Sequence, residues 1–268
     1  MADQNDKAGE DYWSKEWSNY KIPDFNTITA RKAANYIPWS YHELFTQIFG
    51  QEELRGKSIL ELGCGNSAWL AYFNKEWGLE VSGLDYSEEG CTKSRYILDQ
   101  ANVKGNVILA DMFDAPEELV GKFDIVCSFG VIEHFEDTTG AIKAASIFLK
   151  PGGKLITTVP NHNGITGFFQ KTFSKEIFNI HKILAEDDLK TAVKGAGLTY
   201  ENSGYFINFS LYANPGIQGK GNPFYKIKKL LLKMSAFKSR IFWWIEIRTK
   251  ILPGSKNYSA AIFCVGSK

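Results

Sequence analysis

The chain has 268 residues, of which 44% are hydrophobic and 23% charged, and its formal net charge is +1. This near-neutral balance excludes nucleic-acid binding driven by overall charge, and the composition excludes a wholly disordered chain. The four cysteines form no Cys-x-x-Cys pair, the first ten residues are polar and no long apolar run occurs, so the sequence predicts a cytoplasmic protein without a zinc or disulfide framework.

The first fifty residues are predicted to form a tail and a helical lid. Residues 1–11 are polar and predicted to be a mobile tail, whereas residues 12–49 are aromatic and helix-like. Trp13 and Trp17 are four residues apart, so they share one face of a helix. That face either closes over a ligand or packs on the core, and the sequence leaves both interpretations open.

Strand and helix patterns alternate from residue 57 onwards. Apolar segments at 58–62, 80–84, 107–109, 123–128 and 154–159 predict strands, and helices are predicted at 67–77, 87–101, 138–148 and 186–196. This alternation predicts βαβ units and a mainly parallel sheet in an α/β fold. Two further strands are predicted at 204–212 and 258–265.

A basic helix is predicted at residues 226–250, inside an insert at about 213–256. Its apolar residues recur with the spacing of a helix face, and Glu246 is the one acid among eight lysines and arginines. Such a helix can make peripheral contact with an anionic membrane or bind an acidic acceptor. The favoured interpretation is that its apolar stripe caps the acceptor cleft or forms a dimer interface, with its lysines in water.

The strongest chemical motif is the turn Gly63-Cys64-Gly65, which follows the first strand and opens a helix. Glycines allow a tight turn and close approach of a ligand to the backbone, and the free N–H groups of the helix start suit a polar ligand. With Ala68 the segment also reads as Gly-x-Gly-x-x-Ala, so a dinucleotide site or a purely structural turn stays open from this motif alone.

Acidic residues follow the next two strands. Asp85 ends the second strand and can accept hydrogen bonds from both hydroxyls of a ribose. Asp111 follows the third strand and can accept from an adenine amino group, while Met112 can pack on the ring. Either acid alone could be a helix cap, but glycines and acids at three successive strand ends predict a ligand at the carboxyl edge of the sheet.

At residues 57–197 the chain resembles the class I S-adenosylmethionine-dependent methyltransferases, in a small-molecule, quinone-methyltransferase-like branch. The resemblance rests on the segments ILELGCGNS, VSGLDYS, LADMFD, FDIVCSFGVIEHFED and LKPGGKLITTVPN. It implies a Rossmann-like doubly wound sheet of seven strands, mostly parallel with the last strand antiparallel, within a methyltransferase domain at 51–268. It also implies S-adenosyl-L-methionine as cofactor and S-adenosyl-L-homocysteine as product.

The family's cofactor-binding residues map onto particular positions here. By resemblance, the cofactor would be bound by Glu61, Gly63, Cys64, Gly65, Asp85, Tyr86, Asp111, Met112, Ser128 and Phe129. The lid and acceptor pocket would be formed by Tyr12, Trp13, Trp17, Tyr20, Arg31, Asn161 and His162.

His134 is the best candidate for a catalytic base, because it follows the fourth strand and histidine transfers protons near neutral pH. It could instead only order its loop. His181 is a second candidate on the acceptor side. Some quinone methyltransferases bind a divalent metal through a further Glu three residues before the Glu-His pair, and Gly130 stands there in this chain, so no metal is expected.

The predicted function is transfer of a methyl group to an oxygen or nitrogen of a small-molecule metabolite, such as a natural-product or sugar intermediate. A lipid, quinone or lipid-linked acceptor at a membrane surface is the alternative within enzymes. Outside enzymes, the alternative is a non-catalytic S-adenosylmethionine-binding module. No nucleic-acid partner is expected, and the sequence predicts no oligomeric state.

Overall fold

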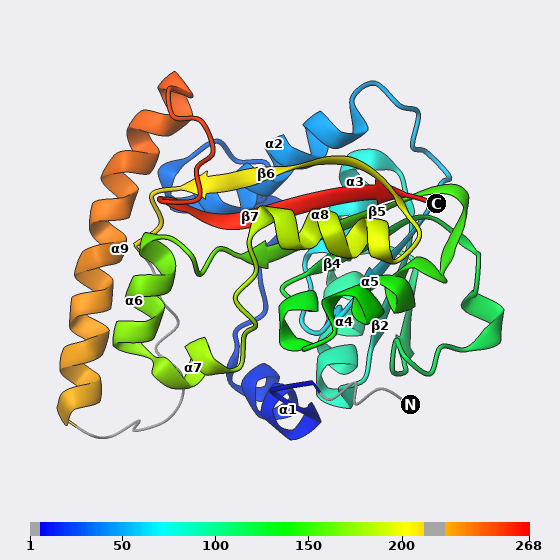
Figure 1. Cartoon of the computed structure of the whole chain (residues 1–268), viewed down its shortest axis with the longest axis horizontal. Helices are drawn as coiled ribbons and strands as arrows, with labels where there is room; N and C mark the ends of the chain where they lie inside the picture. The colour runs from blue at the N-terminus through cyan, green and yellow to red at the C-terminus, as the bar shows by residue number, and fades with distance from the viewer. Residues whose placement is uncertain (1–5, 212–222) are drawn as a thin grey trace.

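The computed structural model describes residues 6–211 and 223–268 (Figure 1). Residues 1–5 of the predicted tail lie outside the described residues. So do residues 212–222, which include the last residue of the strand predicted at 204–212 and the beginning of the predicted insert.

A seven-stranded sheet forms the centre of the molecule, in the order β3-β2-β1-β4-β5-β7-β6. The strands are β1 (Ser58–Leu62), β2 (Glu80–Asp85), β3 (Gly105–Leu109), β4 (Phe123–Phe129), β5 (Leu149–Pro160), β6 (Thr199–Asn208) and β7 (Ser259–Ser267). Strands β1 to β5 pair in parallel, and β7 is antiparallel to both of its neighbours, β5 and β6. The predicted fold class is confirmed. The strand order reverses between β1 and β4, which is where doubly wound sheets bind ligands.

Helices cover both faces of the sheet. They are α1 (Glu10–Asn19), α2 (Tyr36–Phe49), α3 (Trp69–Trp77), α4 (Glu88–Ala101), α5 (Thr138–Ser146), α6 (Ile165–Phe173), α7 (Lys175–Asn179), α8 (Glu186–Gly195) and α9 (Pro223–Thr249). One hydrophobic core joins the sheet to α5 and α8, which lie in front of it in Figure 1, and a second joins it to α2, α3 and α4. The sheet is therefore buried on both faces, as its continuous apolar strands require.

Side-chain caps fix where the helices beside the crevice begin. The Ser87 side chain accepts a hydrogen bond from the Gly90 amide at the start of α4, and the Asp137 side chain accepts one from the Gly140 amide at the start of α5. Such caps satisfy donors that the first turn of a helix leaves unpaired. The end of β2 is thereby joined to α4 by a short turn, and the longer loop after β4 ends at the cap of α5.

Two strands depart from the predicted ranges by more than two residues. Strand β5 begins at Leu149 rather than 154, because residue 149 still pairs with Phe123 of β4, across a shift of register. Strand β6 spans Thr199–Asn208 rather than 204–212. It begins soon after Gly197, and the left-handed backbone angle at Phe209 follows its last residue.

The long helix α9 packs against one edge of the body and is seen on the left in Figure 1. The favoured interpretation offers two options for its apolar stripe. The stripe does not cap the acceptor cleft, because those side chains are exposed; Phe237 is 64% exposed and Leu230 58%. The other option, a dimer interface, stays a prediction. The residues that hold α9 to the body are instead Leu232, Trp243 and Ile247. Among residues 6–211 and 223–268, no helix combines the length and hydrophobicity that crossing a bilayer requires.

Candidate functional site

The turn after β1 is shaped by two glycines. Gly63 has a left-handed φ of 68°, and a Cβ there would lie 2.5 Å from the Val131 side chain. A Cβ on Gly65 would lie 2.5 Å from the indole nitrogen of Trp17 and 2.9 Å from a carboxylate oxygen of Asp85. Both positions therefore exclude side chains, and the turn is closely approached by lid and sheet.

Buried carboxyl groups hold this turn in place. Asp85 accepts hydrogen bonds from the backbone N–H groups of Gly65 and Ser87, both at 2.7 Å. Glu61 accepts the Ser67 hydroxyl at 2.8 and 2.7 Å. Burial raises the pKa of Asp85 to about 6 and the pKa of Glu61 to about 8. Asp85 therefore gains or loses its proton within about one pH unit of neutrality, so a ligand that prefers the carboxylate can shift it to the ionised form.

A crevice cavity of about 440 Å³ lies over the ends of β1, β2 and β3. Asp85, Asp111 and Met112 are among the residues that line it. The Asp111 carboxylate accepts the Phe113 amide at 2.9 Å, which holds it at the end of its strand. The predicted cofactor residues Cys64 and Ser128 are fully buried and are not part of the lining of this cavity, and the Ser128 hydroxyl lies 2.9 Å from that of Thr157.

A smaller cavity of about 80 Å³ adjoins the crevice cavity and shares Asp85 and Tyr86 with it. Its remaining lining includes Trp13, Phe129 and His134. The predicted cofactor residues on β2 and β4 are thus brought to one continuous space, with a predicted base at its wall.

The N-terminal segment closes over this space and adds a residue that the sequence does not single out. The Asp6 carboxylate accepts hydrogen bonds from the Trp13 indole, at 3.0 Å, and from the Tyr86 hydroxyl. The Lys7 amide donates to the His134 carbonyl at 3.0 Å. Residues 6 and 7 are therefore docked on the site, whereas the polar composition predicts a mobile tail. No sequence pattern marks Asp6, because its partners are distant along the chain.

Helix α1 is fastened to the body by polar contacts. The hydroxyls of Ser14 and Ser87 lie 3.0 Å apart, and the Lys93 ammonium donates to the Trp17 carbonyl. Trp13 and Trp17 stack with ring centroids 5.5 Å apart. An element held by a few polar contacts can open more easily than one held by an apolar core, which suits a lid.

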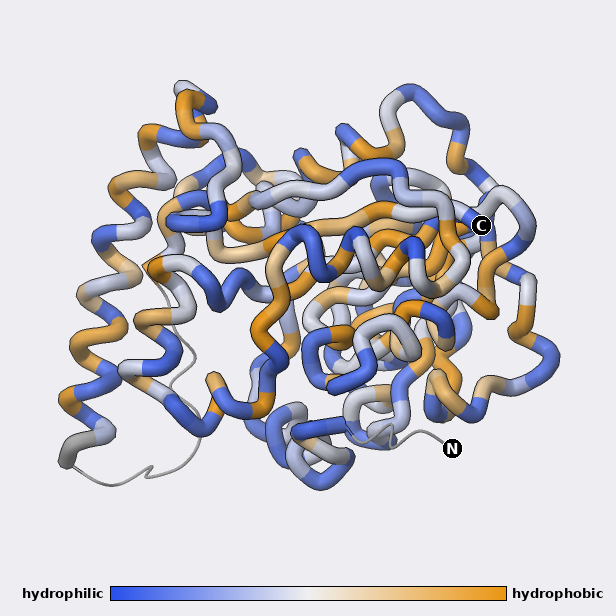
Figure 2. Tube along the Cα trace, in the orientation of Figure 1, coloured by the Kyte–Doolittle hydropathy of each residue, from blue (hydrophilic) through white to orange (hydrophobic). Residues whose placement is uncertain are grey.

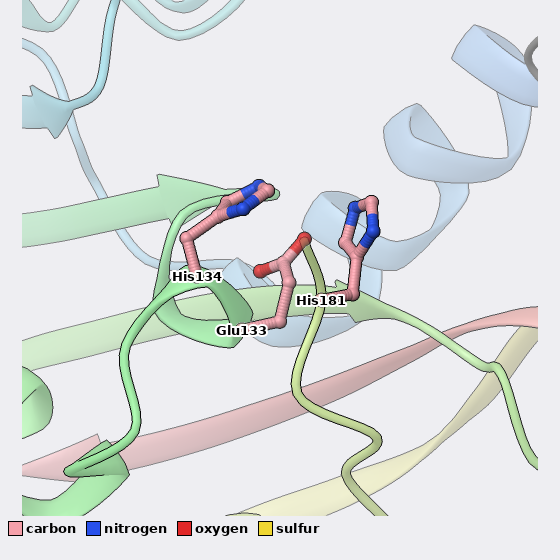
Figure 3. A group of neighbouring side chains, drawn as sticks. All are labelled: Glu133, His134 and His181. Atoms are coloured by element: carbon pink, nitrogen blue, oxygen red, sulfur yellow. The ribbon is translucent and has the colours of Figure 1, made fainter. Parts of the chain in front are cut away.

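Three histidines from separate loops meet beneath these tryptophans. The ring centroids are 5.0 Å apart for Trp13 and His134, 4.7 Å for His134 and His181, and 4.9 Å for His162 and His181. Figure 3 shows His134 and His181 with Glu133 beside them. We call Glu133, His134, His162 and His181 the histidine cluster.

Hydrogen bonds define which nitrogen carries the proton in two of these rings. The His134 Nδ1 lies 3.1 Å from the Ile180 carbonyl oxygen, and the His181 Nδ1 lies 2.5 Å from the Ile177 carbonyl oxygen. A carbonyl only accepts, so each Nδ1 is the donor and each Nε2 is the basic nitrogen. The buried His134 Nε2 has no hydrogen-bond partner among the described residues.

Burial keeps the histidine cluster uncharged. It lowers the pKa of His134 below its usual value, that of His162 to about 4 and that of His181 to about 3. It raises the pKa of Glu133 to about 8. At neutral pH each imidazole is therefore in its neutral form, with one unprotonated ring nitrogen.

The same cluster contains potential metal ligands. One ligand atom from each of Glu133, His134 and His181 lies within 4.8 Å of the others. Ligands of one zinc ion, bound at about 2.1 Å, are roughly 3.4 Å apart in a tetrahedral site, so these side chains would have to move closer to hold one. The expectation from Gly130 that no metal is bound stays a prediction.

A lid cavity of about 390 Å³ lies on the other side of the two tryptophans. Its lining, much of it apolar, includes Tyr12, Tyr20, His162 and His181, and it shares Trp13 and Trp17 with the small cavity. The two spaces therefore adjoin across the tryptophan pair, with the histidine cluster between them.

Two predicted acceptor residues lie elsewhere. The Arg31 guanidinium donates to the Ile247 carbonyl and lies 5.6 Å from the Trp39 ring, so it anchors α9. The Asn161 side chain donates to the carbonyls of Lys256 and Ser259, both at 2.8 Å, so it braces the segment before β7. Asn161 directly precedes His162 in the chain, but neither Arg31 nor Asn161 is among the residues that line the small cavity or the lid cavity.

The strand order and the crevice over the ends of β1, β2 and β3 match the fold that the resemblance to class I methyltransferases predicts, and the cofactor of that class is S-adenosylmethionine. The residues present fit that cofactor, because buried Asp85 and the side-chain-free surface at Gly65 lie at the switch point of the sheet. A family model described as a methyltransferase domain matches residues 36–203, and the chain belongs to this family.

Curated relatives and solved structures agree with this class. The chain is 26% identical over 155 residues to the ubiquinone biosynthesis O-methyltransferase of Acinetobacter baumannii (strain AYE), across 54% of this chain and 65% of the relative. It is 30% identical over 110 residues to the enzyme of the same name from Vibrio parahaemolyticus, across 41% of this chain and 46% of the relative. The matches thus span less than two thirds of these relatives.

Solved structures share the fold at low identity. Geranyl diphosphate C-methyltransferase from Streptomyces coelicolor A3(2) superposes with a TM-score of 0.60 at 11% identity, covering 96% of this chain and 97% of that one. Phosphoethanolamine N-methyltransferase 2 from Haemonchus contortus gives 0.54 at 16% identity, covering 92% and 60%. These likenesses show the fold and leave the acceptor to be argued from the site.

Proposed function

We propose that this protein transfers a methyl group to an oxygen or nitrogen atom of a small-molecule metabolite bound in the lid cavity. The observation that carries the proposal is the buried His134 Nε2, which has no hydrogen-bond partner among the described residues. The other ring nitrogen, Nδ1, donates to the Ile180 carbonyl, so Nε2 is the basic nitrogen. The residue His134 lines the small cavity together with Trp13 and Trp17, and these two tryptophans also line the lid cavity.

We assign each residue of the site a role from its position in the two cavities. Asp85 and Asp111 would hold the nucleoside part of S-adenosylmethionine, which when bound supplies a methyl group on a positively charged sulfur. Trp13 and Trp17 would exclude water between the two cavities, so that the methyl group passes to the bound acceptor and not to water. As the acceptor atom gains the methyl group, it loses its proton to the Nε2 of His134.

The lining of the lid cavity favours an acceptor with an apolar ring and one ionisable group. Tyr12, Trp13 and Tyr20 offer ring surfaces, and His162 and His181 offer neutral nitrogens that can orient a hydroxyl or amine. A phenol-like or aromatic amine metabolite fits these features better than a bare sugar does.

A lipid or quinone acceptor is the second candidate function. Two observations favour it: the apolar lining of the lid cavity and the similarity to proteins named ubiquinone biosynthesis O-methyltransferases. The two candidates differ in where the methylated product dissolves.

We would incubate the protein with methyl-labelled S-adenosylmethionine and an extract of cellular metabolites and lipids, then separate aqueous and organic phases. Label in aqueous small molecules is the expected result, and label in the organic phase would favour the lipid candidate. Absence of label, with S-adenosylhomocysteine still bound, would indicate a non-catalytic binding module.

His134→Gln is the matched variant for the proposed base. Loss of general-base catalysis is expected to slow turnover by about 10²–10⁴-fold, while S-adenosylhomocysteine affinity stays unchanged. Equal turnover of the variant and the unsubstituted protein would contradict the role of His134.

A further inference from the structure

Helix α9 has an inner face that fixes its rotation against the body. Trp243 stacks on Tyr36 with ring centroids 5.1 Å apart, and its indole donates to the Asn208 carbonyl at 2.9 Å. The Ser239 hydroxyl accepts the Leu211 amide at 2.8 Å. Ser239, Trp243 and Leu232 are at most 6% exposed, so they define the side of α9 that is buried.

The opposite face is apolar and open to water. Its members recur every three or four residues, and they are Ile227, Leu230, Met234, Phe237, Ile241 and Ile245. We call these six residues the outer stripe. Each is between 45% and 64% exposed, and Figure 2 shows hydrophobic segments recurring along the whole of α9. An exposed apolar row of this length marks an interaction surface, because water disfavours it strongly.

Cations follow one flank of the outer stripe. Lys226, Lys229, Lys233 and Arg240 are separated by three, four and seven residues, so they form a row beside it. Glu246, the one acid of the described helix, is 9% exposed and is bonded to the Asn208 side chain. The charge that α9 presents to solvent is therefore uniformly positive.

The outer stripe and the row of cations beside it together indicate the kind of partner. A second copy of the chain would bring its own cations toward these, whereas an anionic surface would neutralise them. An apolar row flanked by lysines is the pattern of a helix that lies in the plane of a bilayer, with its stripe at the boundary of headgroups and acyl chains. Trp244, which is 55% exposed and stacks under Arg248 at 4.0 Å, suits that boundary.

We propose that α9 docks this protein on the surface of an anionic lipid bilayer, with the outer stripe inserted and the flanking cations at lipid phosphates. The inference does not depend on the identity of the methyl acceptor. It explains why six large apolar side chains of the helix face away from the body although other apolar residues hold the helix to it.

Vesicle sedimentation tests the proposal with the full-length protein. We would compare vesicles of phosphatidylcholine alone with vesicles that contain phosphatidylglycerol in a phosphatidylcholine background. The partition coefficient should rise by about tenfold or more on the anionic vesicles and fall again at high salt, because each lysine near the surface contributes independently. Equal partitioning onto both vesicles would overturn the proposal.

Variants separate the stripe from the rest of the surface. Leu230→Glu with Phe237→Glu should abolish vesicle binding, and folding should be preserved since both side chains are exposed. Val120→Glu is the matched control, because Val120 is 45% exposed and lies outside α9. Binding that survives the double substitution, or that is lost equally in the control, would refute the assignment of the stripe.

A local probe distinguishes insertion from self-association. The four native cysteines are buried, so a cysteine introduced by Phe237→Cys can be labelled selectively with an environment-sensitive dye. A blue shift on anionic vesicles, absent for a dye at Val120→Cys, is expected. A blue shift that follows protein concentration without vesicles would show that a second copy covers the stripe, and would overturn the membrane proposal.

Discussion

Replacing Asp85 by asparagine removes the charge at the centre of the crevice and keeps nearly the same shape. The carboxylate accepts two backbone N–H groups at 2.7 Å, from Gly65 and Ser87. An asparagine oxygen can replace one of these bonds, while its amide nitrogen faces the other donor. An unpaired buried donor costs about 1–3 kcal/mol, offset in part by the removal of a buried charge.

The direction of the pH effect follows from burial. The pKa of Asp85 is raised from 3.8 to about 6, so the folded state favours the neutral form. That difference corresponds to roughly 3 kcal/mol of stability, which is present below pH 3.8 and is lost as the pH rises through about 6. Hydroxyl groups of a bound ribose donate best to the ionised form, so ligand binding favours the charge that folding alone disfavours.

The expected consequences are specific. Affinity for S-adenosylhomocysteine should fall about tenfold between pH 7 and pH 5, because one proton must be displaced from Asp85. Asp85→Asn should weaken binding by roughly 100-fold at pH 7.5, since two hydrogen bonds to a charged group are lost, and should flatten the pH dependence.

Isothermal titration calorimetry at several pH values measures both effects, with circular dichroism to check folding. Asp124→Asn is the matched control: Asp124 also accepts a backbone N–H, from Ser58 at 2.8 Å, but lies at the start of β4, away from the crevice. Binding by Asp85→Asn within threefold of the unsubstituted protein, or an unchanged pH profile, would refute the role assigned to Asp85.

Two further predictions concern the lid and the histidine cluster. Gly65→Ala places a methyl group 2.5 Å from the Trp17 indole, so it should destabilise the closed lid by about 1–3 kcal/mol and reduce S-adenosylhomocysteine affinity. Thermal unfolding of a double-mutant cycle with Trp17→Ala should reveal this coupling, and strictly additive effects would argue against the contact. Treatment with a chelator should leave methyl transfer unchanged, as Gly130 predicts. Loss of activity that a divalent metal restores would instead identify the histidine cluster as a metal centre.

The sequence by itself determined the sheet and the cofactor side of the site. Alternating apolar segments, the Gly63-Cys64-Gly65 turn and acids at the ends of two strands are local patterns, and parallel strands bring their carboxyl ends to one edge. The crevice that contains Asp85 and Asp111 could therefore be predicted without knowing how the helices pack.

Only the tertiary structure decided the acceptor side. His134, His162 and His181 follow different elements, and the packing of their loops brings the His181 ring within 5 Å of each of the other two rings. No pattern in the sequence marks this approach. The docking of Asp6 on Tyr86 likewise joins residues 80 positions apart. For α9, the amphipathic pattern predicted a helix. Which face of that helix packs on the body depends on the surface that the body offers. Trp243 and Ser239 fit that surface, so the more apolar stripe was left outside.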